Sequence, residues 1–227
     1  MPGAKHRNLF ITGPTGRLEA IFWTPERTLA IENGLSIAAV VCHPHPLFGG
    51  TMHNKVVYQV ARTLDRLGVA TLRFNFRGTG ASAGEHDKGR GEQEDVRAAL
   101  DYLAGEIPGA NMLVAGFSFG CWVGLRAGCA DPRVKELVGL GAPVNDSDMS
   151  YLGACDKPCL LIQGERDPYG APHKLEEVVA AFPEVMRRET SVIVVPGADH
   201  FFTGLLDQVG LALTKWMVAR HPELESK

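Results

Sequence analysis

The chain has 227 residues, of which 45% are hydrophobic and 22% are charged, and its formal net charge is −3. These values are ordinary for a globular protein, and we expect a single domain over residues 1–227. No basic stripe points to nucleic acid, and the longest apolar runs, such as "LSIAAVVC", fall far short of the roughly 20 residues of a membrane helix.

The predicted elements begin with an antiparallel hairpin, in which strands at 9–12 and 18–24 flank the turn "GPTG". Beyond it, short apolar runs alternate with stretches of helical periodicity. The further strands are predicted at 37–42, 69–76, 112–117, 134–141, 158–164 and 191–197, and the helices at about 55–67, 92–104, 119–130, 172–181 and 202–219. This alternation predicts an α/β fold with a mostly parallel, twisted sheet of about eight strands and helices on both faces.

Two loops of unusual composition follow buried strands. The first, "HPHPLFGGTMHNK", contains His43, His45 and His53, which could suggest a metal site. Histidines two residues apart with prolines between them are a poor chelate, however, and no cluster of carboxylates or cysteines accompanies them. We therefore expect hydrogen-bonded loop histidines and no metal. The second loop, "RGTGASAGEHDKGRGE", is rich in glycine and charge, and we expect it to be mobile.

The segment "AGFSFG" places Ser118 in a G-x-S-x-G motif between a predicted strand and a predicted helix. Gly116 and Gly120 leave the space that a sharp turn at the serine requires. The helix that follows begins beside the serine, so its backbone N–H groups can stabilise a developing oxyanion. This context predicts that Ser118 is a nucleophile.

A serine nucleophile needs a base, and where G-x-S-x-G forms such a turn between a strand and a helix, an acidic residue and then a histidine follow the serine along the chain. Asp167 and His200 each come directly after a late strand, and neighbouring strand ends lie close together. We therefore expect Ser118, Asp167 and His200 to form a triad. Asp146 and Asp148 are alternative acids, because they also follow a strand. Glu165 and Asp199 are expected to be solvated or to make local hydrogen bonds. Three further histidines, His86, His173 and His221, are expected to be solvated.

The loop after the strand at 37–42 is expected to supply the second N–H group of an oxyanion hole. Pro44 and Pro46 have no N–H group. The donor is therefore His45, Leu47 or Phe48.

The segments "HPHPLFGGTMHNKV", "RFNFRGTGAS", "GFSFG", "QGERD" and "GADHFF", in this order, resemble those of the α/β-hydrolase superfamily. The chain is similar over nearly its whole length to small, dienelactone-hydrolase-like bacterial serine carboxylesterases. The resemblance implies the α/β-hydrolase fold, with Ser118 as nucleophile, Asp167 as acid and His200 as base. It also implies that the Phe119 N–H group lies in the oxyanion hole. Dienelactone hydrolase itself has a cysteine where this chain has Ser118.

Many members of this superfamily carry a helical cap domain, but only about 16 residues separate the strands at 134–141 and 158–164. We therefore expect no cap domain and an open site, shaped by loops that carry Phe48, Tyr169 and Phe201 and by Trp122 or its neighbours.

The expected function is a serine hydrolase, a carboxylesterase that cleaves small, short-chain esters through an acyl-enzyme on Ser118 without any cofactor. A thioesterase or peptidase-like enzyme with the same triad is an alternative, and a non-catalytic binding protein of the same fold is another. The expected partner is a small ester substrate, with no nucleic acid and no membrane, and the expected state is a monomer or a small homo-oligomer.

The first residues, "MPGAKHRNLF", contain no apolar signal-peptide stretch, and the five cysteines show no C-x-x-C pairing. These two features predict reduced thiols and a cytoplasmic protein.

Overall fold

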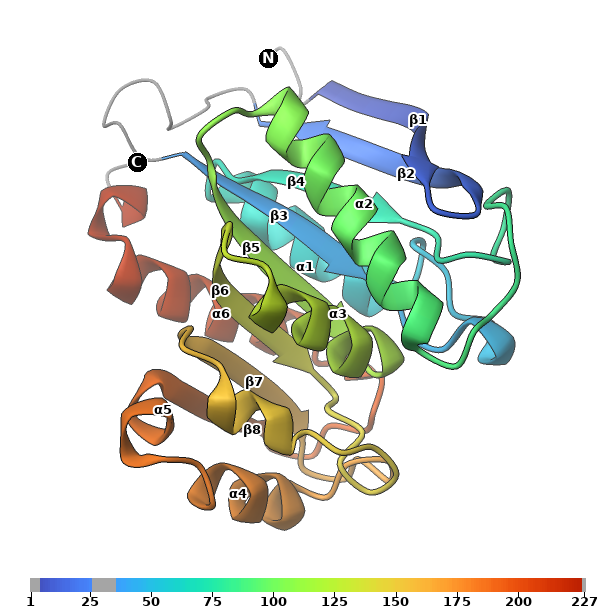
Figure 1. Cartoon of the computed structure of the whole chain (residues 1–227). Coiled ribbons are helices and arrows are strands. Elements are labelled where there is room, and N and C mark those ends of the chain that lie inside the picture. Colours follow the sequence, from blue (N-terminus) through green and yellow to red (C-terminus); the bar gives the residue numbers. More distant parts are fainter. Residues whose placement is uncertain (1–4, 26–35, 226–227) are drawn as a thin grey trace.

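The computed structural model describes residues 5–25 and 36–225. Residues 1–4, 26–35 and 226–227 of the predicted 1–227 domain lie outside the described residues. Eight strands form one sheet in the order β1-β2-β4-β3-β5-β6-β7-β8 (Figure 1). The strands are β1 (Lys5–Gly13), β2 (Gly16–Thr24), β3 (Ile37–Cys42), β4 (Ala70–Phe74), β5 (Asn111–Phe117), β6 (Val134–Leu140), β7 (Cys159–Gly164) and β8 (Thr190–Val195). The predicted α/β architecture of about eight strands is confirmed.

The N-terminal hairpin is antiparallel, and β2 also pairs antiparallel with β4. From β4 to β8 every neighbouring pair is parallel. Strand β1 begins at Lys5 rather than at the predicted residue 9. Its first residues, "KHRN", are polar and lie on an edge strand, so apolar patterning gives no signal for them.

The central strands are buried on both faces, as their continuous apolar sequences predict. Strand β3 illustrates this, because alternate residues contact different cores: Ala38, Val40 and Cys42 join the core on one face. Ile37 and Val41 join the core on the other face.

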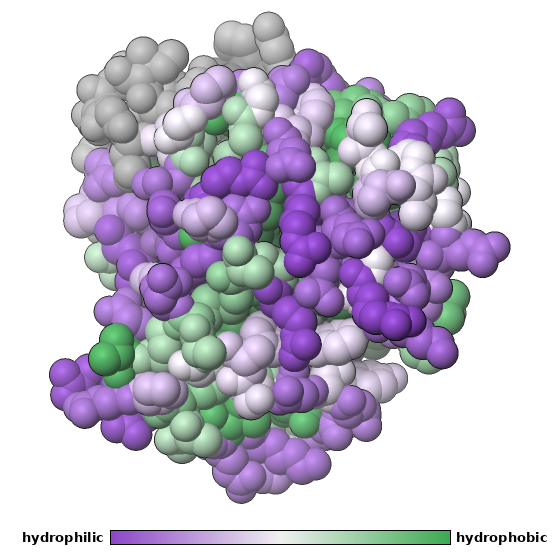
Figure 2. Space-filling view, viewed as in Figure 1, coloured by the Kyte–Doolittle hydropathy of each residue, from purple (hydrophilic) through white to green (hydrophobic). Residues whose placement is uncertain are grey.

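Helices cover both faces of the sheet (Figure 1). The helices α1 (Lys55–Arg66) and α6 (Leu206–Arg220) contribute to one core. The helices α2 (Arg90–Glu106), α3 (Phe119–Ala130), α4 (Pro172–Ala180) and α5 (Glu184–Glu189) contribute to the other. Figure 2 shows hydrophilic side chains over most of the face that α2 and α3 cover, with hydrophobic residues in smaller areas between them.

Several short helices were not predicted: α5 and the 3-10 helices η2 (Pro46–Phe48), η3 (Ser150–Ala154) and η4 (Pro222–Glu225). Helices of one or two turns are stabilised by packing more than by propensity, so their sequences carry little signal.

The connection from β6 to β7 carries only η3, and no cap domain is present in the described part of the chain. None of the helices within residues 5–25 and 36–225 combines the length and the apolar character that crossing a bilayer requires.

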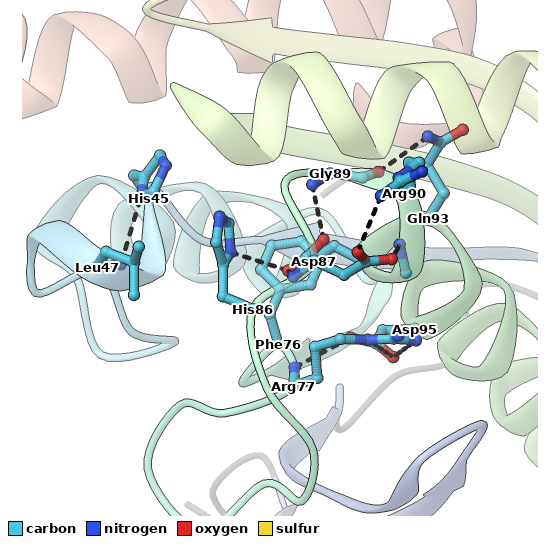
Figure 3. Close-up of polar contacts among 12 residues, drawn as sticks. His45, Leu47, Phe76, Arg77, His86, Asp87, Gly89, Arg90, Gln93 and Asp95 are labelled. Atoms are coloured by element: carbon cyan, nitrogen blue, oxygen red, sulfur yellow. Dashed lines mark hydrogen bonds and ion pairs between the residues drawn. The ribbon is translucent and has the colours of Figure 1, made fainter.

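The glycine-rich segment between β4 and α2 is held in place rather than left free (Figure 3). The backbone N–H group and the guanidinium of Arg77 both bind the fully buried carboxylate of Asp95, with a shortest contact of 2.8 Å. The carboxylate of Glu92 accepts the backbone N–H groups of Asp87 and Gly89, each at 2.8 Å. The expectation of a mobile loop rested on composition, which does not report that buried carboxylates recruit such donors.

Candidate active site

Ser118 lies between the end of β5 and the start of α3, with φ 56° and ψ −118°. A positive φ is costly for a residue with a side chain, and it persists here because the surroundings leave no alternative. A Cβ atom on Gly116 would lie 2.1 Å from the carbonyl oxygen of Gly120, and one on Gly120 would lie 2.5 Å from the carbonyl oxygen of His43. Both glycines are therefore required for α3 to begin so close to β3 and β5, and the turn lifts Ser118 to the edge of the sheet.

The side chains of Ser118, His200 and Asp167 are in hydrogen-bonding contact. His200 Nε2 lies 3.0 Å from Ser118 Oγ, and His200 Nδ1 lies 2.7 Å from Asp167 Oδ2. His200 and Asp167 are each only 4% exposed. The structure thus brings together three residues from the carboxyl ends of β5, β7 and β8.

The two alternative acids lie elsewhere. Asp146 is exposed at the wall of the neighbouring cavity, and Asp148 lies 3.9 Å from the guanidinium of Arg126. Within the described residues, neither carboxylate is hydrogen bonded or ion-paired to His200.

The carboxylate of Asp167 is held by several donors besides His200. Its Oδ1 accepts the backbone N–H groups of Tyr169 at 2.8 Å and Gly170 at 3.2 Å. Its Oδ2 also accepts the amide of Gln163 at 2.8 Å, and Gln163 Oε1 in turn accepts the Ala142 N–H group. These contacts fix the direction from which Asp167 meets His200.

Gln163 was not identified from the sequence as part of this site. It is fully buried within β7, in the otherwise apolar run "CLLIQG". A polar side chain buried in a central strand must find partners, and that mismatch is the signal that could have revealed its role.

Aromatic rings surround the imidazole of His200. The ring centroids of Phe117, Tyr169 and Phe201 lie 4.9, 4.7 and 5.2 Å from its centroid. These contacts restrict the rotation of the imidazole, so that one nitrogen faces Ser118 while the other faces Asp167.

The three candidate N–H groups of the loop after β3 have different partners. The Leu47 N–H group donates to the Nδ1 atom of the His45 ring at 3.2 Å, and the Phe48 N–H group donates to the His45 carbonyl oxygen at 3.1 Å. The His45 N–H group has no acceptor among the described residues. The Phe119 N–H group, at the first position of α3, also lacks an acceptor there.

His43 is fully buried, and both of its ring nitrogens have backbone partners. Nδ1 lies 2.6 Å from the Pro44 carbonyl oxygen, and Nε2 accepts the Phe76 N–H group at 3.0 Å. Burial lowers the pKa of His43 to about 4, so the neutral ring is the stable form. In the described ranges no three side chains of the types that bind metals are grouped closely enough to hold an ion.

A cavity of about 670 Å³ opens beside Ser118 and His200. Phe48, Trp122, Tyr169 and Phe201, the aromatic residues expected to shape the site, all line it.

Three histidines had been expected to be solvated. His173 is exposed, as expected, but the side chain of His86 is only 12% exposed and lines the cavity. The side chain of His221 is 16% exposed and pairs with Glu136. For these two residues the expectation of solvation was wrong. His86 lies beside the buried carboxylate of Glu92 across a loop, and His221 lies beside the buried carboxylate of Glu136, which is far away in the sequence.

Comparison with known proteins places these features in a family context. A family model described as an alpha/beta hydrolase domain matches residues 39–215. An uncharacterised protein of Rickettsia prowazekii is 33% identical over 215 residues, which cover 92% of this chain and 88% of that protein.

Two solved structures are also similar over nearly their full length. An alpha-beta serine hydrolase homologue from Coxiella burnetii superposes with a TM-score of 0.83 at 33% identity, covering 93% of this chain and 97% of that chain. A protein from Xanthomonas campestris, described as a member of the α/β serine hydrolases without a lid, superposes with a TM-score of 0.82 at 33% identity, covering 97% and 95% of the two chains.

Proposed function

Because this chain belongs to the alpha/beta hydrolase family, we propose that it is a serine hydrolase that cleaves small carboxylic esters through an acyl-enzyme on Ser118. The observation that carries the proposal is the continuous contact from Ser118 Oγ through His200 to Asp167, with distances of 3.0 and 2.7 Å. The strained position of Ser118 at the start of α3 supports it further, because this is where a nucleophile meets the N–H groups of a helix.

In the proposed reaction, Ser118 Oγ attacks the ester carbonyl while His200 Nε2 takes the hydroxyl proton. Asp167 accepts the Nδ1–H group, which keeps Nε2 free to act as the base and stabilises the imidazolium that forms. The imidazolium then donates its proton to the leaving alcohol, and the acyl group remains on Ser118. Water attacks the acyl-enzyme by the same steps, which releases the acid and restores Ser118.

The negative charge on the carbonyl oxygen needs donors that are already in place. The Phe119 N–H group at the start of α3 is one such donor. For the second we propose the His45 N–H group, since the Leu47 and Phe48 N–H groups already have acceptors within the protein. A donor without a protein acceptor loses no hydrogen bond when the oxyanion forms.

The size of the accessible space supports small substrates. The cavity of about 670 Å³ has aromatic walls, and the described residues include no cap domain that would enclose a long chain. We expect the highest kcat/KM with the shorter members of a p-nitrophenyl ester series from acetate to palmitate. A maximum at the long-chain end would contradict the substrate class.

The first test of the proposal is Ser118→Ala. It should remove nearly all ester hydrolysis, because loss of a serine nucleophile costs on the order of 10⁶ in kcat. The variant should also lose labelling by a fluorophosphonate probe, while circular dichroism and the melting temperature report an intact fold. A Ser118→Ala protein that still hydrolyses esters at the wild-type rate would rule out the proposed nucleophile.

A further inference from the structure

The imidazole rings of His45 and His86 lie side by side at the wall of the cavity that contains Ser118. Their centroids are 4.9 Å apart, and both rings pack on the ring of Phe119, at 4.8 and 5.6 Å. Figure 3 shows the two rings next to each other, one from the loop after β3 and one from the segment before α2. Phe119 and Ser118 line the same cavity, so this histidine pair, His45 and His86, faces the space in which the proposed reaction takes place.

The ring of His45 presents a hydrogen-bond donor. Its Nδ1 atom accepts the Leu47 N–H group at 3.2 Å, so Nδ1 carries no proton. In a neutral imidazole the proton then resides on Nε2, an assignment made from the hydrogen-bond partner. Burial, and next the nearby His86, lower the pKa of His45, which favours this neutral form. The Nε2–H group has no acceptor among the described residues.

The ring of His86 presents an acceptor. Its buried Nδ1 atom lies 2.9 Å from Glu92 Oε1, in an approach too oblique for a well-aligned hydrogen bond. The two oxygens of Glu92 accept the backbone N–H groups of Asp87 and Gly89. An acceptor so close to Nδ1 favours a proton there, because two lone pairs would repel each other. The Nε2 atom of neutral His86 is then a bare acceptor, and it too has no partner in the described part of the chain.

On the basis of the hydrolase function proposed above, we propose that this histidine pair binds a hydroxyl group of the substrate. The hydroxyl oxygen accepts the Nε2–H group of His45, and its own hydrogen is donated to Nε2 of His86. A hydroxyl that makes two such bonds spans about 4.6 Å between the two nitrogens. Ring centres 4.9 Å apart leave room for the two Nε2 atoms to lie at such a separation.

Other polar groups fit the histidine pair less well. A carboxylate only accepts hydrogen bonds, so it would face the lone pair of His86 Nε2. An ammonium group only donates, so it would face the N–H group of His45. The substrate class is therefore an ester with a hydroxyl near its carbonyl, either in the acyl part or in the alcohol part.

Matched ester pairs, in which a hydroxyl replaces a methyl group, test this directly. For the acyl part, the pair is p-nitrophenyl 3-hydroxybutyrate and p-nitrophenyl 3-methylbutyrate. For the alcohol part, the pair is 2-hydroxyethyl butyrate and propyl butyrate. In one of the two pairs, kcat/KM should favour the hydroxylated ester by about tenfold after correction for uncatalysed reactivity, because two hydrogen bonds in an open site are each worth a few-fold. The pair that shows the preference identifies the side of the ester that carries the hydroxyl.

Three variants separate the histidine pair from other causes. His86→Phe and His45→Phe keep an aromatic ring but remove the nitrogens. Each should therefore bring the ratio of kcat/KM between the hydroxylated and the methylated ester close to one. Either variant is sufficient if the other does not fold. Lys88→Asn is the control, since Lys88 lines the same cavity at φ 52°, a conformation that asparagine tolerates. It removes the nearby charge, and the preference should remain.

The possible results keep the two proposals distinct. Hydrolysis of all four esters without a preference, or a preference that survives both phenylalanine variants, would overturn the hydroxyl site while the hydrolase function stands. Failure to hydrolyse any of the esters would overturn the proposed esterase function and the hydroxyl site with it.

Discussion

The backbone of His45 has φ −55°, a value that a proline ring adopts without strain. His45→Pro therefore removes the N–H group proposed for the oxyanion hole and preserves the local dihedral angle. We expect kcat to fall by roughly 10²–10³, the usual cost of losing one oxyanion donor, with little change in melting temperature. Steady-state kinetics with p-nitrophenyl acetate and a thermal melt measure both quantities.

Two further variants complete this test. His45→Ala keeps the N–H group and deletes the ring. With p-nitrophenyl acetate, which carries no hydroxyl, its kcat should therefore fall much less than that of His45→Pro. Leu47→Pro removes an N–H group that already donates to His45 Nδ1, so its kcat should also fall much less than that of His45→Pro. If Leu47→Pro shows the larger catalytic loss, the second oxyanion donor is Leu47 and the present assignment is wrong.

The carboxylate that supports His200 can be tested in the same way. Asp167→Asn replaces an acceptor with an amide that can present a donor to His200 Nδ1, so the ring loses its productive tautomer. We expect kcat to fall by about 10⁴, the loss seen for this change in a serine protease. Asp146→Asn and Asp148→Asn should remain within a few-fold of wild type, since neither carboxylate is hydrogen bonded to His200 among the described residues. The reverse ranking would move the acid to the loop after β6.

At the scale of elements, His43 joins the ends of two neighbouring strands. It directly follows β3, its Nε2 atom accepts the N–H group of Phe76 just beyond β4, and its Nδ1 atom lies 2.6 Å from the Pro44 carbonyl oxygen. The ring thereby fixes the start of the loop that carries His45. We infer that His43 stabilises the loop as a neutral, buried group rather than acting in the chemistry.

This role makes a prediction about pH. Burial lowers the pKa of His43 from 6.5 to about 4, so the unfolded chain binds a proton more readily than the folded protein between these values. The contribution of the neutral ring is complete above pH 6.5 and is lost as the pH falls towards 4, a difference of about 3 kcal/mol at most. His43→Gln removes the titrating group. The difference in free energy of unfolding between wild type and His43→Gln should therefore shrink between pH 7 and pH 4. Urea denaturation across this range measures it, and a constant difference would contradict the assignment.

At the scale of the whole molecule, the C-terminal end of α6 is tied to strand β6 of the sheet. Glu136 in β6 is 5% exposed, and its Oε1 atom lies 2.7 Å from Arg220 Nε and 2.9 Å from His221 Nε2. Burial alone would raise the pKa of Glu136, but hydrogen bonds from His221 and Arg220 hold it below its usual value. The hydrogen bond with Glu136 raises the pKa of His221.

Glu136→Gln should therefore destabilise the protein, and by more at pH 5.5 than at pH 9. The folded-state pKa of His221 is raised, so its contribution is complete below pH 6.5 and is lost as the pH rises through the folded value. The pKa of Glu136 is lowered, so its contribution is complete above pH 4.5 and is lost only as the pH falls through the folded value. Both are therefore present at pH 5.5. Melting temperatures of wild type and Glu136→Gln at the two pH values provide the measurement, and an equal loss at both would show that His221 contributes nothing.

The sequence by itself determined the sheet, most helices and the three residues of the proposed triad. Continuous apolar runs such as "IAAVVC" identify strands that are buried on both faces, and Gly116 and Gly120 mark the turn around Ser118. Asp167 and His200 could be placed because parallel strands end at the same edge, so residues that follow them converge whatever the details of packing.

The tertiary structure alone decided which groups around the triad are free to act. The Leu47 N–H group is unavailable because the ring of its neighbour His45 folds back to accept it. Gln163 holds Asp167, and His86 reaches the cavity because Glu92, across a loop, faces its ring. Periodicity and motifs report where a residue lies along the chain, but a hydrogen bond depends on angles and distances of a few ångströms between side chains, and only the packed structure sets these.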